Sequence, residues 1–281
     1  MSESHWRLAM KAIRDPRRAV LRLVLRSRLR KLDVEQERAD LLDFLSGSFH
    51  VDAAGLLEEY RGSEFRRWFQ ERREALEGFP GPYRLGTTGS FGCEAMYLLV
   101  RAARPKRLVE TGVLYGGSTA HVLAALDRNG EGELHSIELG RDEREPTHDF
   151  FVPAELKSRW DLIIGDSRQA LPDLLRRCGR IDMFHHDSLH TWDHMTWEFE
   201  TALPYLAEGG VLSSDDVLNP PSLMGIFRPN PFHAFCERAG LGYRTFNNLG
   251  VAVRGSRLER PAGEDRAELV AHSDGRGSWT R

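Results

Sequence analysis

The regular alternation of apolar and amphipathic segments from about residue 89 onward constrains the fold more than any other feature. Five apolar stretches have the length of buried strands, and most are followed by a segment whose apolar residues have helical spacing. These stretches are residues 107–112, 133–139, 160–167, 181–186 and 209–217. Strands that alternate with helices across short connections form a parallel sheet with helices on both faces. We therefore expect an α/β fold built on a mostly parallel sheet.

Two further strand patterns occur towards the C-terminus, at residues 243–248 and 251–255. A tight turn at Leu249-Gly250 predicts that these two strands are antiparallel. They would close one edge of the sheet, so that a mostly parallel sheet ends in an antiparallel strand.

The α/β pattern is preceded by helical patterns at about 34–45, 52–61 and 64–76. The sequence Pro80-Gly81-Pro82 then breaks the chain and marks a boundary. Polar residues rich in Arg, Glu, Gly and Ser follow the last strand pattern, as in disordered tails. We expect an N-terminal helical extension at 1–80, an α/β domain at 81–256 and a disordered tail at 257–281.

Composition and charge narrow the class of protein. The chain has 281 residues, 41% hydrophobic and 29% charged, as in ordinary soluble domains, and a net charge of −3. Residues 1–31 hold ten Lys or Arg against two acidic residues, a balance of +8, which leaves −11 for the remainder. A negatively charged body argues against general nucleic-acid binding. Three scattered cysteines without CxxC spacing argue against a disulfide framework and indicate a reducing, cytoplasmic compartment.

A basic helix is expected near the N-terminus, where Asp15-Pro16 has the pattern of a helix start and apolar residues recur among arginines. Such a helix could lie on an anionic membrane surface. We favour docking of its leucines on the body of the protein or on a second subunit, since its apolar face lacks the Trp or Phe typical of membrane helices. No apolar run is long enough to span a bilayer. Membrane contact is therefore not favoured, and a homo-oligomer stays open.

A glycine-rich connection after the first expected strand indicates a nucleotide-type ligand. Glu110 and Gly112 end that strand, and a helix begins near Gly116-Gly117-Ser118. Glycines let the backbone turn sharply beside a ligand, and a helix N-terminus offers free N–H groups to an anion. The spacing of Gly112 and Gly116 differs from the GxGxxG of dinucleotide-binding proteins. Without other signals, the loop would also be compatible with a simple tight turn.

Polar residues also end the next two expected strands. Glu138 ends the second strand, where a carboxylate can accept hydrogen bonds from both ribose hydroxyls, and Asp166-Ser167 end the third, within reach of an adenine edge. Each alone would more often be a helix cap or a surface residue. Ligands of open α/β sheets bind at the carboxyl ends of the strands. The three strand ends together therefore predict one nucleoside site.

The order VETGVLYGGST, IEL, GDS and then strand-end carboxylates resembles the class I S-adenosylmethionine-dependent methyltransferases over roughly residues 85–255. The resemblance implies a Rossmann-like sheet and S-adenosylmethionine as the cofactor. Within this class the chain looks most like the metal-dependent O-methyltransferases of the catechol and macrolide-sugar types. The resemblance also implies a set of cofactor contacts: Glu110, Gly112 and Ser118 at the methionine end, Glu138 at the ribose, and Ser167 with Arg168 at the adenine.

Acidic residues follow the next two expected strands and predict a metal site. Asp187 follows residues 181–186, and Asp215-Asp216 lie near the end of 209–217. Magnesium prefers hard oxygen ligands and keeps several waters, so these three aspartates predict a magnesium site with positions left for substrate hydroxyls. A single aspartate would more often cap a turn. Enzymes of the catechol type carry an Asp–Asn pair where this chain has Asp215-Asp216, so the direct ligand among the two stays open.

His190 is the expected general base. It lies three residues after Asp187, so both side chains can face one pocket. An imidazole with an ordinary pKa of about 6.5 suits proton abstraction near neutrality. The catechol type carries a lysine at this position and the macrolide-sugar type a histidine. The expected reaction is an in-line displacement in which the base takes the hydroxyl proton and the oxygen attacks the sulfonium methyl group.

The neighbouring histidines leave other interpretations open. His185 and His186 lie on the expected strand, where one would pack inward, while His194 and Glu198, one helical turn apart, are expected to pair at a helix surface. A zinc hydrolase would use nitrogen or sulfur ligands, whereas paired aspartates favour a harder ion. The sequence therefore predicts a magnesium-dependent O-methyltransferase acting on a small molecule, such as a sugar or another natural-product intermediate. The alternatives are a metal-dependent hydrolase and a non-catalytic, membrane-peripheral nucleoside-binding protein.

Overall fold

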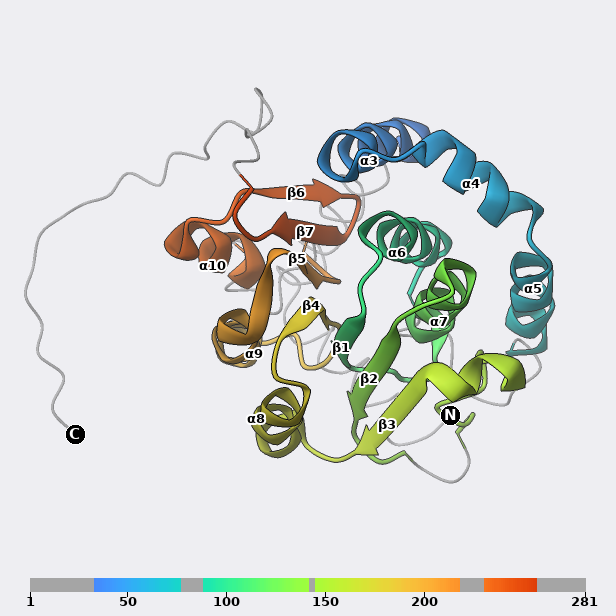
Figure 1. The fold of residues 1–281 in the computed structure, drawn as a ribbon. Coiled ribbons are helices and arrows are strands. Elements are labelled where there is room, and N and C mark those ends of the chain that lie inside the picture. Colours follow the sequence, from blue (N-terminus) through green and yellow to red (C-terminus); the bar gives the residue numbers. More distant parts are fainter. Residues whose placement is uncertain (1–32, 77–87, 142–144, 218–229, 257–281) are drawn as a thin grey trace, which may run out of the picture.

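The protein, here a computed structural model, is described for residues 33–76, 88–141, 145–217 and 230–256. It is built around one seven-stranded sheet (Figure 1). The strands are β1 (Arg107–Thr111), β2 (Glu133–Glu138), β3 (Trp160–Ile164), β4 (Ile181–His186), β5 (Leu206–Ser214), β6 (Tyr243–Phe246) and β7 (Leu249–Val253). The expected basic N-terminal helix, the break at residues 80–82 and the C-terminal tail lie outside the described residues.

The order of strands across the sheet is β3-β2-β1-β4-β5-β7-β6. The first five strands are mutually parallel, while β7 pairs antiparallel with both β5 and β6. The order reverses between β1 and β4, and this switch point is where open α/β sheets bind their ligands. The structure thus confirms the expected mostly parallel, Rossmann-like sheet with an antiparallel strand near its edge.

The turn between β6 and β7 was wrongly predicted at Leu249-Gly250, because the structure places it at Asn247-Asn248. Asn247 has a φ of 53°, a left-handed conformation that asparagine tolerates. Gly250 lies within β7 and pairs with neighbours on both sides. A Cβ atom there would lie 2.6 Å from the ring of Phe232, so this glycine serves close packing rather than a turn.

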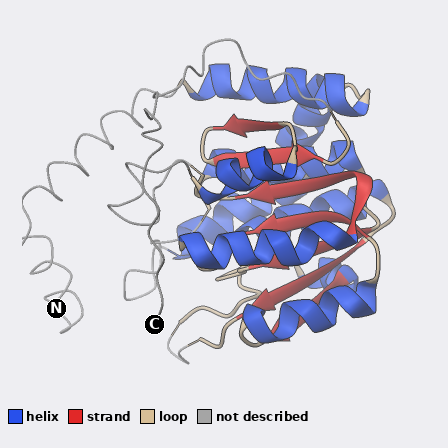
Figure 2. Ribbon diagram, turned by 90° about the vertical axis from the view of Figure 1, so that its left-hand side faces the viewer, coloured by secondary structure: helices blue, strands red, loops and turns tan. Residues whose placement is uncertain are grey.

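Helices cover both faces of the sheet (Figures 1 and 2). One face is covered by α6 and α7, with the N-terminal helices outside them, and the other by α8, α9 and α10. The α-helices are α3 (Val34–Phe49), α4 (Ala53–Gly62), α5 (Glu64–Leu76), α6 (Ser90–Ala103), α7 (Gly117–Asn129), α8 (Ser167–Cys178), α9 (Trp192–Ala202) and α10 (Pro231–Ala239). Short 3₁₀ turns occur at η1 (Ala154–Arg159) and η2 (Leu203–Tyr205).

The N-terminal helices α3–α5 share a hydrophobic core with the α/β part. Leu41, Leu45 and Phe69 belong to the same buried cluster as the apolar residues of α6 and α7. Helix α3 also reaches the sheet edge, where Glu37 accepts a hydrogen bond from the backbone N–H of Asn247 at 2.6 Å. The extension therefore packs against the sheet edge that borders the site described below.

None of the helices in the described ranges combines the length and the apolar character needed to cross a bilayer. The three cysteines are free thiols, as their spacing predicts.

Candidate functional site

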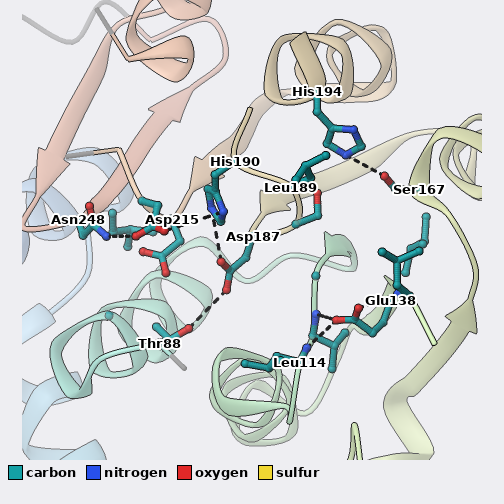
Figure 3. Close-up of a pocket in the computed structure, with 18 of the residues that line it drawn as sticks. Thr88, Leu114, Glu138, Ser167, Asp187, Leu189, His190, His194, Asp215 and Asn248 are labelled. Carbon is teal, nitrogen blue, oxygen red and sulfur yellow. Dashed lines mark hydrogen bonds and ion pairs between the residues drawn. The ribbon is translucent and has the colours of Figure 1, made fainter. Parts of the chain in front are cut away.

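A cavity of about 1090 Å³ lies at the carboxyl ends of the central strands. The connections after β1 to β5 contribute to its wall, together with the start of α6 and the β6–β7 turn. Figure 3 shows the polar side chains that gather there, with Glu138 and Ser167 on one side and Asp187, His190 and Asp215 on the other. The sheet thus brings the two groups of residues predicted from the strand ends to one cavity.

The glycine loop after β1 follows a path that requires glycine at two positions. Gly112 has a φ of 88°, and a Cβ atom on it would lie 2.1 Å from the carbonyl oxygen of Asp187. Gly116 has a φ of 80°, and its Cβ atom would lie 2.7 Å from the carbonyl oxygen of His148. Gly112 lines the cavity. These glycines therefore let the loop pack directly against the backbone after β4 and against residue 148.

Glu138 holds this loop in place. Its Oε2 atom accepts hydrogen bonds from the backbone N–H groups of Val113 and Leu114, each at 2.6 Å (Figure 3). Its Oε1 atom accepts a third, from the N–H of Leu139, at 2.6 Å. An ionised carboxylate offers about four lone-pair positions. Glu138 therefore shapes the loop, and Oε1 keeps one lone-pair position that can accept a hydrogen bond from a ligand hydroxyl.

Glu110 and Ser118, both predicted cofactor contacts, lie beneath the loop rather than in the cavity wall. Glu110 is fully buried and accepts hydrogen bonds from the hydroxyls of Ser118, Thr119 and Ser136 at 3.2, 2.8 and 2.8 Å. Burial raises the pKa of Glu110 to about 7, although these hydroxyls lower it. In this structure Glu110 joins β1, β2 and α7, and direct contact with a cofactor stays a prediction for both residues, as it does for Gly116.

Asp166, Ser167 and Arg168 line the cavity at the start of α8. The Asp166 side chain caps the helix by accepting from the N–H of Arg168 at 2.8 Å. The guanidinium of Arg168 lies 5.0 Å from the ring centre of Trp197, a cation–π contact. The structure thus places all three residues together, as the sequence predicts, and adds a helix-capping role for Asp166.

His190 lies between two of the predicted aspartates. Its Nε2 atom is 3.7 Å from Oδ1 of Asp187, and its Nδ1 atom is 3.9 Å from Oδ2 of Asp216. Thr88 donates to the other oxygen of Asp187 at 3.4 Å (Figure 3). The spacing of three residues between Asp187 and His190 therefore does bring both side chains to one cavity wall.

The electrostatics of this wall reflect crowded, largely buried charges. Desolvation raises the pKa of Asp187 well above its ordinary value, and the charges of Asp215 and Asp216 add to this effect. Desolvation, together with the charge of Asp216, raises the pKa of Asp215 to about 7. Desolvation and the nearby His186 lower the pKa of His190 to about 4. At neutral pH the His190 imidazole is therefore uncharged and can accept a proton, but it is a weaker base than the ordinary imidazole of pKa about 6.5 expected from the sequence.

Asp216 is held by the β6–β7 turn. Its Oδ1 atom accepts a hydrogen bond from the side-chain amide of Asn248, and the carbonyl of Asn248 accepts from the N–H of Val217 at 3.1 Å. Asp216 has a φ of 57°, a left-handed conformation that Asp adopts more readily than most residues. Asn248 was not predicted from the sequence, since it lies 32 residues further along the chain.

The three aspartates do not converge on one point. Within the described part of the chain, no group of three or more His, Cys, Asp or Glu side chains is arranged to hold a metal ion. The chemistry of the donors nevertheless fits a hard divalent cation, because a cation would neutralise the like charges that, after desolvation, raise the pKa of Asp187 and Asp215. The magnesium site stays a prediction.

Glu198 is the main residue that the sequence interpretation misjudged. It does pair with His194, as expected, at 2.8 Å, but both are buried, with Glu198 at 0% exposure, rather than at a helix surface. His186 is also buried and lies 2.7 Å from Glu198 through Nδ1, while His185 bonds to Ser213 at 3.0 Å. The helical spacing of Met195, Phe199 and Ala202 was the signal available, because it places residue 198 on the buried face of α9.

Comparisons with known proteins agree with this architecture. Residues 109–217 match a family model described as a methyltransferase domain. A similar solved structure is the O-methyltransferase TomG of Streptomyces achromogenes, involved in tomaymycin synthesis and bound to S-adenosylmethionine, with 22% identity and a TM-score of 0.51 over 67% of this chain and 90% of that one. Another is a methyltransferase from Geobacter sulfurreducens, with 18% identity and a TM-score of 0.51 over 66% and 89%. No curated protein sequence matches the chain.

Proposed function

We propose that this chain, which has the class I methyltransferase fold and a methyltransferase domain at residues 109–217, transfers the methyl group of S-adenosylmethionine to a hydroxyl of a small molecule. The resemblance inferred from the sequence is confirmed for the fold and the domain. We further propose that the methyl group is transferred to oxygen, and we propose the kind of acceptor, the metal ion and the base.

One observation carries the proposal: a single cavity is lined by Glu138 and residues 166–168, predicted to hold the nucleoside, and by the His190–Asp187 pair. The cofactor would lie along the glycine loop, with its ribose at Glu138 and its adenine near Ser167 and Arg168. The loop meets the backbone of Asp187 directly at Gly112. The sulfonium methyl group would therefore lie close to the base.

The chemistry assigned to His190 is removal of the acceptor's proton. Its imidazole is uncharged near neutrality, since its pKa is lowered to about 4. As the hydroxyl oxygen forms its bond to the methyl carbon, the carbon–sulfur bond breaks and the proton moves to His190. Asp187 and Asp216, 3.7 and 3.9 Å from the ring, would stabilise the resulting imidazolium before it releases the proton to water. Holding both substrates in contact can lower the activation free energy of such a transfer by about 7–11 kcal/mol.

A magnesium ion would be held by Asp187 and Asp215, with Asp216 as a third candidate. When bound, the ion would make an acceptor hydroxyl more acidic and help to orient it. The pKa values of Asp187 and Asp215 are raised first by desolvation and then by neighbouring carboxylates, and the crowding of these like charges supports this proposal.

The acceptor side of the cavity combines apolar and polar residues. Phe91, Phe246 and Leu249 offer apolar surface, and Thr88 and Asn248 offer hydrogen-bonding groups. This mixture suits a compact molecule with both a hydrophobic part and several hydroxyls, such as a sugar or another natural-product intermediate. We propose such an acceptor and a cytoplasmic location.

The proposal is tested with purified protein, S-adenosylmethionine labelled in its methyl group, Mg²⁺ and a panel of phenols, sugars and aliphatic alcohols. Calorimetry should detect binding of S-adenosylmethionine, and label should pass to one class of hydroxyl. His190→Ala should abolish transfer and spare cofactor binding, because the base does not hold the cofactor. The matched control is His135→Ala, which should leave transfer unchanged, because His135 is a half-buried residue of β2 that pairs with Asp161 and does not line the cavity.

Two outcomes would reject the proposal. Absence of binding at millimolar S-adenosylmethionine would remove its basis. Metal-dependent turnover of generic phosphate or ester substrates without S-adenosylmethionine would favour the hydrolase alternative instead.

A further inference from the structure

The carboxylate of Glu198 forms a buried polar centre beneath the cavity. Its side chain is 0% exposed. Burial alone raises the pKa of Glu198, but hydrogen bonds from His186 and His194 outweigh this effect and hold the pKa below its ordinary value. Five side chains donate to this anion: Thr111, Ser167, His186, Ser188 and His194. They come from the ends of β1 and β4, the loop after β4, the start of α8 and α9 itself.

The donors are shared unequally between the two carboxylate oxygens. Thr111 Oγ1 and His186 Nδ1 contact Oε2 at 2.5 and 2.7 Å. Ser167 Oγ, Ser188 Oγ and His194 Nε2 contact Oε1 at 2.6, 2.9 and 2.8 Å. An ionised carboxylate has about four lone-pair positions, which is about two on each oxygen. The three donors on Oε1 are therefore one more than its lone pairs can accept. One hydroxyl hydrogen can therefore turn elsewhere while the carboxylate stays fully hydrogen-bonded.

The three donors on Oε1 are also the ones that line the cavity. Ser167 starts α8 beside Arg168, and Figure 3 shows it facing His194 across the side of the cavity where the adenine would lie. Ser167 Oγ is 3.1 Å from Nε2 of His194, so these side chains form one connected network. The network ties this wall of the cavity to the strand ends at Thr111 and His186.

We propose that Glu198 is a positioning residue for cofactor binding, which fixes Ser167, Ser188 and His194 in the cavity wall and leaves one hydroxyl hydrogen for a ring nitrogen of the bound adenine. The inference rests on the proposed function, because it takes S-adenosylmethionine as the ligand. Glu198 itself does not contact the cofactor and acts through the three side chains.

The first test is Glu198→Gln, which keeps the size of the side chain but replaces one acceptor oxygen with an NH₂ group that faces donors. Calorimetry with S-adenosylhomocysteine should give a dissociation constant about 10- to 100-fold higher than that of the wild type. The matched control is Glu59→Gln. Glu59 accepts from Tyr97 and Arg101 at 2.7 and 2.8 Å, away from the cavity. The Glu59→Gln variant should have a lower melting temperature than the wild type, and its dissociation constant for S-adenosylhomocysteine should change by no more than about twofold.

Serine variants test the surplus donor and do not depend on whether Glu198→Gln folds. Ser167→Ala and Ser188→Ala should each weaken S-adenosylhomocysteine binding about tenfold, because the two donors that remain are both needed on Oε1 and no spare hydroxyl hydrogen is left. The double variant should bind only slightly more weakly than the single variants, since the spare hydroxyl hydrogen is already lost in each of them. Melting temperatures of all variants, measured without ligand, separate loss of binding from loss of folding.

The outcomes separate this inference from the proposed function. A wild-type protein that does not bind S-adenosylhomocysteine would overturn both. Wild-type binding together with unchanged binding by a folded Glu198→Gln variant would overturn this inference alone. Equal weakening by Glu59→Gln would show a general effect of stability, and single serine variants that bind as tightly as the wild type would refute the surplus donor.

Discussion

Replacing Gly112 with alanine should damage the protein in two separable ways. The added Cβ atom would lie 2.1 Å from the carbonyl oxygen of Asp187, 2.4 Å from its carbonyl carbon and 2.8 Å from the N atom of Ser188. These neighbours are backbone atoms and cannot rotate away. Carbon and oxygen atoms pack no closer than about 3 to 3.5 Å, so the chain after β4 must move by about 1 Å.

The magnitude follows from this displacement and from the φ of 88°. A left-handed alanine costs about 1–2 kcal/mol, and forced overpacking about 1–3 kcal/mol more. We therefore expect Gly112→Ala to lower the free energy of unfolding by about 2–5 kcal/mol, measured by urea denaturation. Since the shifted segment carries Asp187, methyl transfer should fall by about 100-fold even where the variant is fully folded.

Gly117→Ala is the matched control at the start of α7. A Cβ atom on Gly117 meets no other atom within 4 Å. Alanine is the better helix former, so this variant should be as stable as the wild type or more stable by up to about 1 kcal/mol. The reasoning would be refuted by a Gly112→Ala protein whose unfolding free energy stays within about 0.5 kcal/mol of the wild type.

Three further predictions concern charge. Glu110→Gln should gain stability relative to the wild type as pH rises from about 5 to 8. Burial raises the pKa of Glu110 to about 7, so native Glu110 holds a proton that the unfolded chain loses near 4.5. The stability of the wild type therefore falls as pH rises through 7. Urea unfolding at several pH values measures this, and a pH-independent difference would contradict it. Asp187→Asn should raise the melting temperature above pH 7 in EDTA, because it removes a desolvated charge that repels Asp215; a lower melting temperature would count against this cause. Glu59→Gln should lower the free energy of unfolding by about 2 kcal/mol at pH 7. The pKa of Glu59 is lowered to about 2, chiefly by Arg101, so this difference should vanish as pH falls from 4.5 through 2.

The fold and the place of the site could be predicted because they depend on short-range patterns. Apolar runs separated by helical segments define β1 to β5, and parallel strands necessarily bring their carboxyl ends to one edge. Glu138 ends a strand, and Asp187 and Asp215 each follow one directly, so their meeting at one cavity required no knowledge of side-chain contacts.

The internal connections of the site could not be predicted, because they join residues far apart in the sequence. Thr111 and Glu198, in direct contact, are 87 residues apart. A glutamate on a helix faces solvent in most proteins, and only the position of its distant partners shows that Glu198 does not. The turn at Asn247 was missed for a related reason, since Gly250 is needed for packing against Phe232 on another element.

The hydrogen bond between Glu37 and Asn247 joins the first described helix to the last hairpin across 210 residues. Because a chain emerges from the ribosome N-terminus first, α3 is made long before its partner on the hairpin exists. The strands that carry the glycine loop, Glu138 and Asp187 are all complete by then. A nascent chain that ends before residue 243 therefore lacks the part of the cavity wall that the β6–β7 turn supplies, and the wall beside Asp216 closes only after this hairpin has been synthesised.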